Sequence, residues 1–311
     1  MRRSAFFTAL LCAAIVPAFA ASSAPAPKPP VPLLWKVSDS DNSVYLLGSF
    51  HMLRADDYPL SPDVDAALAD AEAVMFELPP EEMGSKELAA KLMTAAVRTD
   101  GTMLDSDLTP DLKARLTAWT KKNEVALRKV NLTPQVLQAL EPWFVGLLLT
   151  IVEAGEAGFE ADLGLDEHMA KAAKAANKPA KGLETGAMQL EMLDGMTRET
   201  QVQMLAESLQ SEDGKEHELV TLHREWRNGN ADALLKFMAT DTREKYPDLY
   251  ARMNTARNDT WVPKLDALLK TPGKDDTLVV VGSMHLLGSD GVVEKLKAKG
   301  YKVERVCSAC K

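Results

Sequence analysis

Short runs of apolar residues, bounded by polar, glycine or proline positions, recur along the chain. They cover residues 33–37, 44–47, 73–78 and 277–281, with one basic residue, Lys36, in the first run and one acidic residue in the third. Uninterrupted runs of this length are typical of strands covered on both faces. A polar turn cluster separates the first two runs, so residues 33–48 are predicted to form a β-hairpin.

Elsewhere the apolar residues recur at spacings of three and four, which predicts amphipathic helices. Ser61 and Pro62 predict a helix start, with serine as the N-cap and proline at the first position. With the runs on either side, this helix makes a strand–helix–strand unit, which is usually parallel. Further predicted helices cover residues 81–97, 110–122, 134–154, 165–176, much of 211–270, and 292–299; short strands are predicted at 180–183 and 301–306.

These elements predict an α/β fold with a mixed, mainly parallel central sheet, flanking helices and a large helical insertion at about residues 79–176. Residues 1–20 have two arginines, a short apolar stretch and a small-x-small ending, which predicts a secretory signal peptide. The alternative, a membrane anchor, is disfavoured because the apolar stretch is shorter than the ~20 residues of a spanning helix. We therefore expect an exported protein, periplasmic or secreted, with an Ala/Ser/Pro-rich linker at 21–32 and a single domain at 33–311.

The charge and the cysteine content of the chain argue against two classes of function, nucleic-acid binding and thiol redox catalysis. The chain has 45 acidic and 36 basic residues and a formal charge of −9, which argues against a nucleic-acid partner. No later stretch predicts a membrane span, and the pattern does not indicate an oligomeric state. Cys307 and Cys310 are expected to pair in an oxidising compartment. A redox role is disfavoured because no helix follows them to lower the thiol pKa.

One motif occurs twice, near the two ends of the chain. Residues 48–51 and 282–285 both read Gly-Ser-x-His directly after a predicted strand. In open α/β sheets, ligands bind at the carboxyl ends of the strands. We therefore expect the two strands to lie near each other and to present His51 and His285 to one site.

Carboxylates end two other predicted strands. Glu77 closes the apolar run that begins at residue 73, and Glu184 follows the short strand predicted at 180–183. A carboxylate in apolar surroundings is costly unless it is paired or bound to metal, and the alternative is that each residue marks an exposed strand end. Arg257 and Asn258 precede the last long strand and form either an ordinary polar patch or a site for a carboxylate or an oxyanion.

The other histidines give weaker signals. His168 opens a predicted helix, and a solvated or capping role is the default. His217 and His223 are six residues apart, which places them on different helix faces. Both are predicted to lie at the surface.

Two histidines with one or two strand-end carboxylates predict a divalent-metal site of His51, His285 and Glu77, with Mn, Co or Zn as the ion. Glu77 or Glu184 would act as a base, and Arg257 with Asn258 would stabilise an anion. The sequence has no H-E-x-x-H motif, and Gly-Ser-x-His is not a G-x-S-x-G nucleophile elbow. Ser49 and Ser283 are therefore interpreted as turn residues.

The paired motifs, taken with several others in order, resemble the TraB/GumN family, which is related to the Tiki metalloproteases. The other matching stretches are residues 73–78, 164–166, 182–185 with Gln189, and 257–258. The resemblance covers about residues 31–306. It implies metal-dependent peptidase activity favouring ions such as Mn or Co, and it gives Asp166 weight as a site residue.

Two functions of different class follow. The first is a secreted metal-dependent hydrolase, a peptidase acting on a peptide or protein substrate, in which His51, Glu77 and His285 converge. The alternative is a non-catalytic binding protein for haem, a metal or a polysaccharide, in which the histidines would face an apolar slot without a carboxylate.

Overall fold

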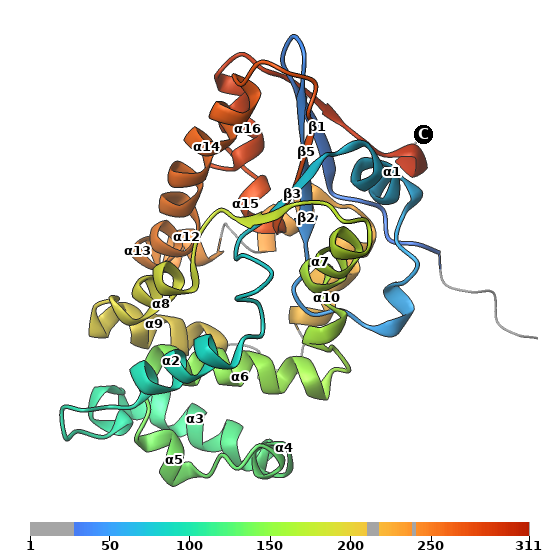
Figure 1. Ribbon diagram of the computed structural model, residues 1–311. Helices are drawn as coiled ribbons and strands as arrows, with labels where there is room; N and C mark the ends of the chain where they lie inside the picture. The colour runs from blue at the N-terminus through green and yellow to red at the C-terminus, as the bar shows by residue number, and fades with distance from the viewer. Residues whose placement is uncertain (1–27, 210–217, 238–240, 311) are drawn as a thin grey trace, which may run out of the picture.

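The computed structural model describes residues 28–209, 218–237 and 241–310. Its centre is a six-stranded sheet in the order β4-β3-β5-β2-β1-β6 (Figure 1). Strands β2 to β5 are mutually parallel, whereas β1 runs antiparallel to both β2 and β6. The strands are β1 (Leu34–Ser38), β2 (Ser43–Ser49), β3 (Ala73–Phe76), β4 (Ala180–Gly182), β5 (Thr277–Gly282) and β6 (Lys302–Arg305).

The two strands that carry the repeated motif are direct neighbours. In the parallel pairing of β2 with β5, Ser49 lies opposite Gly282. The strand–helix–strand unit is parallel as predicted, but β5 is inserted between β2 and β3. Strand β5, from the last quarter of the chain, thereby brings the second histidine between two N-terminal strands.

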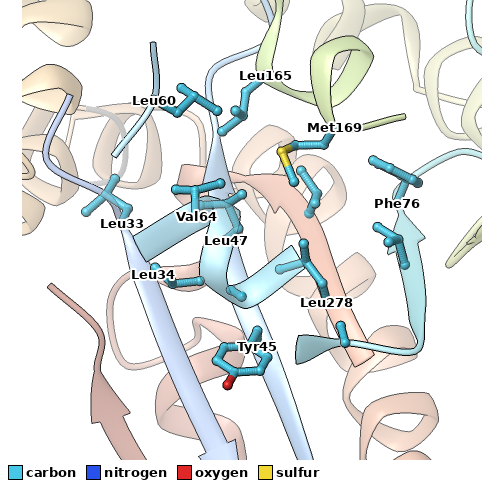
Figure 2. Packing of buried hydrophobic residues seen from close by; sticks show 14 of the residues in the cluster. Leu33, Leu34, Tyr45, Leu47, Leu60, Val64, Phe76, Leu165, Met169 and Leu278 are labelled. Atoms are coloured by element: carbon cyan, nitrogen blue, oxygen red, sulfur yellow. The ribbon is translucent and has the colours of Figure 1, made fainter. Parts of the chain in front are cut away.

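Both faces of the sheet are covered by helices, which explains the uninterrupted apolar runs. Leu47 and Leu278 point to one face and pack with α1 (Pro62–Asp70) and α7 (Leu165–Ala175), as Figure 2 shows. Their neighbours in sequence point to the other face, against α14 (Ala256–Leu269) and α16 (Val292–Ala298). Because side chains alternate along a strand, covering both faces requires apolar residues at every position.

A second core lies in the helical part of the molecule, away from the sheet (Figure 1). It contains the helices of the predicted insertion, but it is completed by α9 (Arg198–Ser208), which lies outside 79–176 and packs on α6. The insertion helices are α2 (Lys86–Ala96), α3 (Pro110–Lys122), α4 (Glu124–Lys129), α5 (Pro134–Gln138) and α6 (Pro142–Glu156).

Proline breaks one helix that the spacing predicts as continuous. Residues 134–154 form two helices, α5 and α6, because Pro142 starts the second one and Glu141 before it is extended. A residue that precedes proline is disfavoured in the helical region.

The remaining helices flank the sheet or connect its strands. Ser61 caps α1 as predicted, since its hydroxyl accepts a hydrogen bond from the Asp63 amide. The other helices are α8 (Gly186–Asp194), α10 (Glu218–Arg227), α11 (Ala231–Leu235), α12 (Asp241–Lys245), α13 (Pro247–Tyr250), a π-helical turn (Ala251–Thr255) and α15 (Ser283–Leu286). No helix in the described ranges is long and apolar enough to cross a membrane.

The two ends of the chain differ in what the structure describes. The predicted signal peptide and residues 21–27 lie outside the described residues. The last part of the predicted linker is held against the domain, since the Val31 amide donates to the Arg227 carbonyl. At the other end, Cys307 and Cys310 form a disulfide.

Candidate functional site

The predicted site residues converge at the carboxyl ends of β2, β3, β4 and β5. His51 follows β2, Glu77 follows β3, Glu184 follows β4 and His285 follows β5 in the short helix α15. Arg257 and Asn258 reach the same place from the first turn of α14. The topology therefore brings all six predicted residues together.

Glu77 lies at the centre of the group. Its Oε1 accepts a hydrogen bond from the Gly282 amide at 2.7 Å, and its Oε2 accepts one from Nη2 of Arg257 at 2.6 Å. The same Oε1 lies 3.9 Å from Nε2 of His51 and 3.8 Å from Nε2 of His285. Burial raises the pKa of Glu77, but His285, Arg257 and His51 lower it, and the net result is a pKa well below the usual range of a carboxyl.

His51 is held by Asp166, from the first turn of α7. The Nδ1–H of His51 donates to Oδ2 of Asp166 at 2.6 Å, and the same oxygen accepts the Ser49 hydroxyl at 2.6 Å. The Asp166 carboxylate raises the pKa of His51 to about 9. Nε2 of His51 is left facing Glu77.

His285 is buried and oriented by Asn258. The amide nitrogen of Asn258 donates to the Asp290 carbonyl, so its oxygen faces Nδ1 of His285 at 2.8 Å and accepts a hydrogen bond from it. The lone pair of His285 is therefore on Nε2, where it accepts a hydrogen bond from Nη1 of Arg257 at 3.0 Å. Burial lowers the pKa of His285 to about 4, so the ring is neutral at neutral pH.

Glu184 forms a buried ion pair with Arg257. Nε of Arg257 lies 3.0 and 3.1 Å from the two carboxylate oxygens of Glu184, and the Trp261 indole donates to one of them at 2.9 Å. Gln189 contributes a further contact at 3.3 Å. With its oxygens occupied in this way, Glu184 is placed to fix Arg257, and it is Glu77 that faces the histidines.

An open cavity of about 350 Å³ leads to His51 and Glu77. His285 is buried and is not among the residues that line this cavity. The residues around it are His51, Glu77, Leu78, Met83, Gly84, Ala161, Asp162, Asp166, Glu167 and Gln189. A larger cavity of about 550 Å³ lies in the helical part, between α3 and α9, and no histidine lines it.

The fit of a divalent ion can be judged from the donor atoms. Among the described residues, no three His, Cys, Asp or Glu side chains stand as a ready-made metal cage. The separations of 3.8 and 3.9 Å from Glu77 Oε1 to the two imidazole nitrogens exceed those between ligands of a tetrahedral ion, which are roughly 3.4 Å for bonds of about 2.1 Å. Side-chain movements of a few tenths of an ångström would close the difference.

Gly282 leaves space between the three donors. A methyl group built on this glycine would lie 3.2 Å from Nε2 of His51, 3.3 Å from Oε1 of Glu77 and 3.5 Å from Cδ2 of His285. In both histidines Nδ1 is hydrogen-bonded to an oxygen and Nε2 faces Glu77. This is the usual arrangement of metal-ligating histidines. The residues present therefore fit a divalent ion, which at Nε2 of His285 would replace the hydrogen bond from Nη1 of Arg257.

Asp166, Trp261 and Gly282 are site residues to which the sequence patterns gave little or no weight. For Trp261 a signal was present, since it lies four residues after Arg257 and so on the same face of α14. The Arg257 guanidinium lies over its ring, 4.7 Å from the centroid, and the His285 ring packs against it at an angle of 52°. Asp166 opens a helix, where acidic residues are common without further function, so its role depends on the tertiary contact with His51.

The other histidines lie outside this site. His168 packs against the Tyr58 ring and makes no contact with Glu77. The prediction that His223 lies at the surface is wrong: it is buried, and its Nε2 is 2.9 Å from Asp57. His217 lies outside the described residues.

Comparison with known proteins agrees with the arrangement of motifs. A family model described as TraB/PrgY/gumN matches residues 33–305. An uncharacterized protein, YbaP, from Escherichia coli strain K12 is 24% identical over 258 residues, which covers 81% of this chain and 87% of that protein; YbaP from Shigella flexneri matches to the same extent. No solved structure matches the chain closely. The chain belongs to the TraB/PrgY/gumN family.

Proposed function

We propose that the protein is a metal-dependent hydrolase of the peptidase type, with His51, His285 and Glu77 as the metal ligands. One observation carries the proposal: two imidazoles from separate Gly-Ser-x-His motifs turn Nε2 toward the same carboxylate oxygen, Oε1 of Glu77, while oxygen acceptors hold both Nδ1 atoms. A divalent ion bound there supplies Lewis-acid chemistry, which polarises a carbonyl and makes water a better nucleophile.

The residues of the chain have separate roles in this proposal. Asp166 and Asn258 fix the two rings, and Arg257 holds Glu77 by Oε2 so that Oε1 faces the histidines. The Arg257 guanidinium, which also reaches His285, stabilises negative charge that develops on a substrate carbonyl oxygen. Glu184 keeps Arg257 in place.

The alternative of a binding protein without turnover has less support. That function calls for histidines facing an apolar slot without a carboxylate. In the structure Glu77 and Asp166 both lie at His51, and the cavity in front of it has several acidic residues. We also propose, from residues 1–20 of the sequence, that the protein is exported.

Metal content tests the proposal. The purified protein is loaded with Mn, Co or Zn, desalted and analysed by elemental mass spectrometry, beside His51→Ala, His285→Ala and the control His168→Ala. We expect near-stoichiometric metal in the wild type and the control, and loss of metal in both site variants. A chelator-sensitive cleavage of a peptide library would then follow. Equal metal in all four proteins, or none in any of them, would sink the proposal.

A further inference from the structure

The charge of the chain is distributed unevenly. Residues 112–136 contain six basic residues and one acidic residue, although acidic residues outnumber basic ones by 45 to 36 in the whole chain. The basic residues are Lys113, Arg115, Lys121, Lys122, Arg128 and Lys129, and the acidic one is Glu124. This stretch comprises α3 without its first two residues, Pro110 and Asp111, together with α4 and the start of α5, which Figure 1 shows at the end of the molecule remote from the sheet.

Basic residues at the ends of α3 and α4 stand close in sequence to two exposed valines. Val125 is 72% exposed and Val130 is 55% exposed. On α4 the buried Leu127 faces the helical core, whereas Val125 and Lys129 lie one turn apart on the opposite, outward face. Lys121 and Lys122 end α3 directly before this face.

Exposed apolar side chains gather in the same part of the molecule. Of the nine large apolar side chains found exposed among the described residues, seven lie within residues 79–176. They are Met93, Val97, Met103, Val125, Val130, Val136 and Ile151. Basic and apolar side chains side by side on an exposed helical surface are typical of proteins that lie on a membrane surface.

Helix capping accounts for only part of this pattern. Basic residues in a last turn favour the helix dipole, and Arg128 is paired with Glu124 one turn earlier. Neither effect explains the exposed valines. Among the described residues, the structure shows no acidic partner for Lys121, Lys122 or Lys129.

We propose that the outer ends of α3 and α4 form a docking surface for an anionic phospholipid bilayer. The lysines meet the negative headgroups, and Val125 and Val130 enter the boundary between headgroups and acyl chains. Each Lys or Arg near such a surface strengthens binding roughly fivefold at physiological salt. A nucleic acid presents the same negative charge, but it has no apolar layer into which the valines could insert. This surface is separate from the metal site, and the proposal does not depend on the activity proposed above.

Vesicle binding tests the proposal. The protein, purified from cells that express the whole chain, is sedimented with vesicles of phosphatidylcholine alone or with about a third phosphatidylglycerol. We expect binding to the anionic vesicles and much weaker binding to the neutral ones. At about 0.5 M salt the binding should fall, because the Debye length shortens to a few ångströms.

Variants locate the surface. The double variant Lys122→Gln/Lys129→Gln removes two exposed charges and should weaken binding to anionic vesicles roughly tenfold or more. Val125→Asp should weaken it to a similar extent. The matched control is Lys297→Gln/Lys302→Gln, which changes the net charge equally at exposed positions on α16 and β6. The control should bind within about twofold of the wild type, and all variants should melt like the wild type.

Several outcomes would overturn the proposal. One is equal binding to neutral and anionic vesicles, and another is no binding to either. A loss as large in the control as in the α3–α4 variants would mean that only net charge matters. A further outcome is that the wild type binds no vesicles and self-associates, whereas the Val125→Asp variant is monomeric. A second copy of the chain would then occupy this surface.

Discussion

Arg257 holds Glu77 through one carboxylate oxygen and leaves the other to the histidines. Nη2 of Arg257 lies 2.6 Å from Oε2, while Oε1 accepts the Gly282 amide and faces both imidazoles. Glu184 accepts hydrogen bonds from Nε and from the same Nη2 of this guanidinium. Two buried carboxylates thus share one buried cation, and the cation determines which oxygen of Glu77 is available.

Removal of this cation should destabilise the fold. Arg257→Gln leaves Glu184 buried without a charge partner and removes from Glu77 the cation that holds its Oε2. Breaking a buried ion pair in this way typically costs about 3–5 kcal/mol in the free energy of unfolding. Urea denaturation without added metal measures the loss. The control is Arg252→Gln, on the preceding turn, which donates only to main-chain carbonyls. A loss no greater than that of the control would contradict a central role for Arg257.

Asp166 should tune metal affinity through His51. Asp166→Asn removes the charge that holds the Nδ1–H of His51, and changes of this kind typically reduce metal affinity about 10–100-fold. Titration calorimetry with Mn or Zn measures the affinity. Asp162→Asn provides the control, because Asp162 lines the same cavity without contacting a histidine side chain. Equal effects of the two changes would indicate general charge rather than ring orientation.

Gly282 should be required because of the space it leaves. Its backbone, with φ of −51° and ψ of 137°, is accessible to alanine. Gly282→Ala places a methyl group between His51, Glu77 and His285, so metal binding should fall at least tenfold while the melting temperature changes by only a few degrees. Gly155→Ala is the matched control, because a methyl group there meets no atom within 4 Å. Metal binding that survives in Gly282→Ala would place the ion elsewhere.

Asp57 should contribute stability that is lost in acid. Burial raises its pKa, but hydrogen bonds from His223, the Arg54 amide and Arg227 lower it, and the net shift is downward. A depressed native pKa gives stabilisation that is present above about pH 4 and disappears as the pH falls through the native value. Asp57→Asn should therefore cost about 3–5 kcal/mol at pH 7.

The pH dependence distinguishes this effect from a simple packing defect. Urea unfolding at pH 7 and pH 3 should show that the wild type loses more stability on acidification than Asp57→Asn does. The control is Asp56→Asn, at the neighbouring exposed position, which should follow the wild type at both pH values. Parallel losses in the wild type and Asp57→Asn would refute the linkage.

Local patterns predicted much of the secondary structure. The apolar runs at β2 and β5, the cap at Ser61 and the helix at 110–122 depend on neighbours within a few residues, and each was found where predicted. The predicted helix at 134–154 shows the limit of periodicity, because Pro142 interrupts it and the spacing of apolar residues does not register a proline.

The sequence by itself determined which chemistry-bearing residues stand at strand ends. His51, Glu77 and His285 come after apolar runs, and Glu184 comes after the short predicted strand at 180–183. Only the tertiary structure decided their partners. The insertion of β5 between β2 and β3 places His285 beside Glu77, and the packing of α7 and α10 places Asp166 on His51 and buries His223 on Asp57. These contacts join residues more than a hundred positions apart. Periodicity and propensity act over a few residues, whereas strand order and side-chain pairing arise from burial of surfaces that meet only when the whole chain folds.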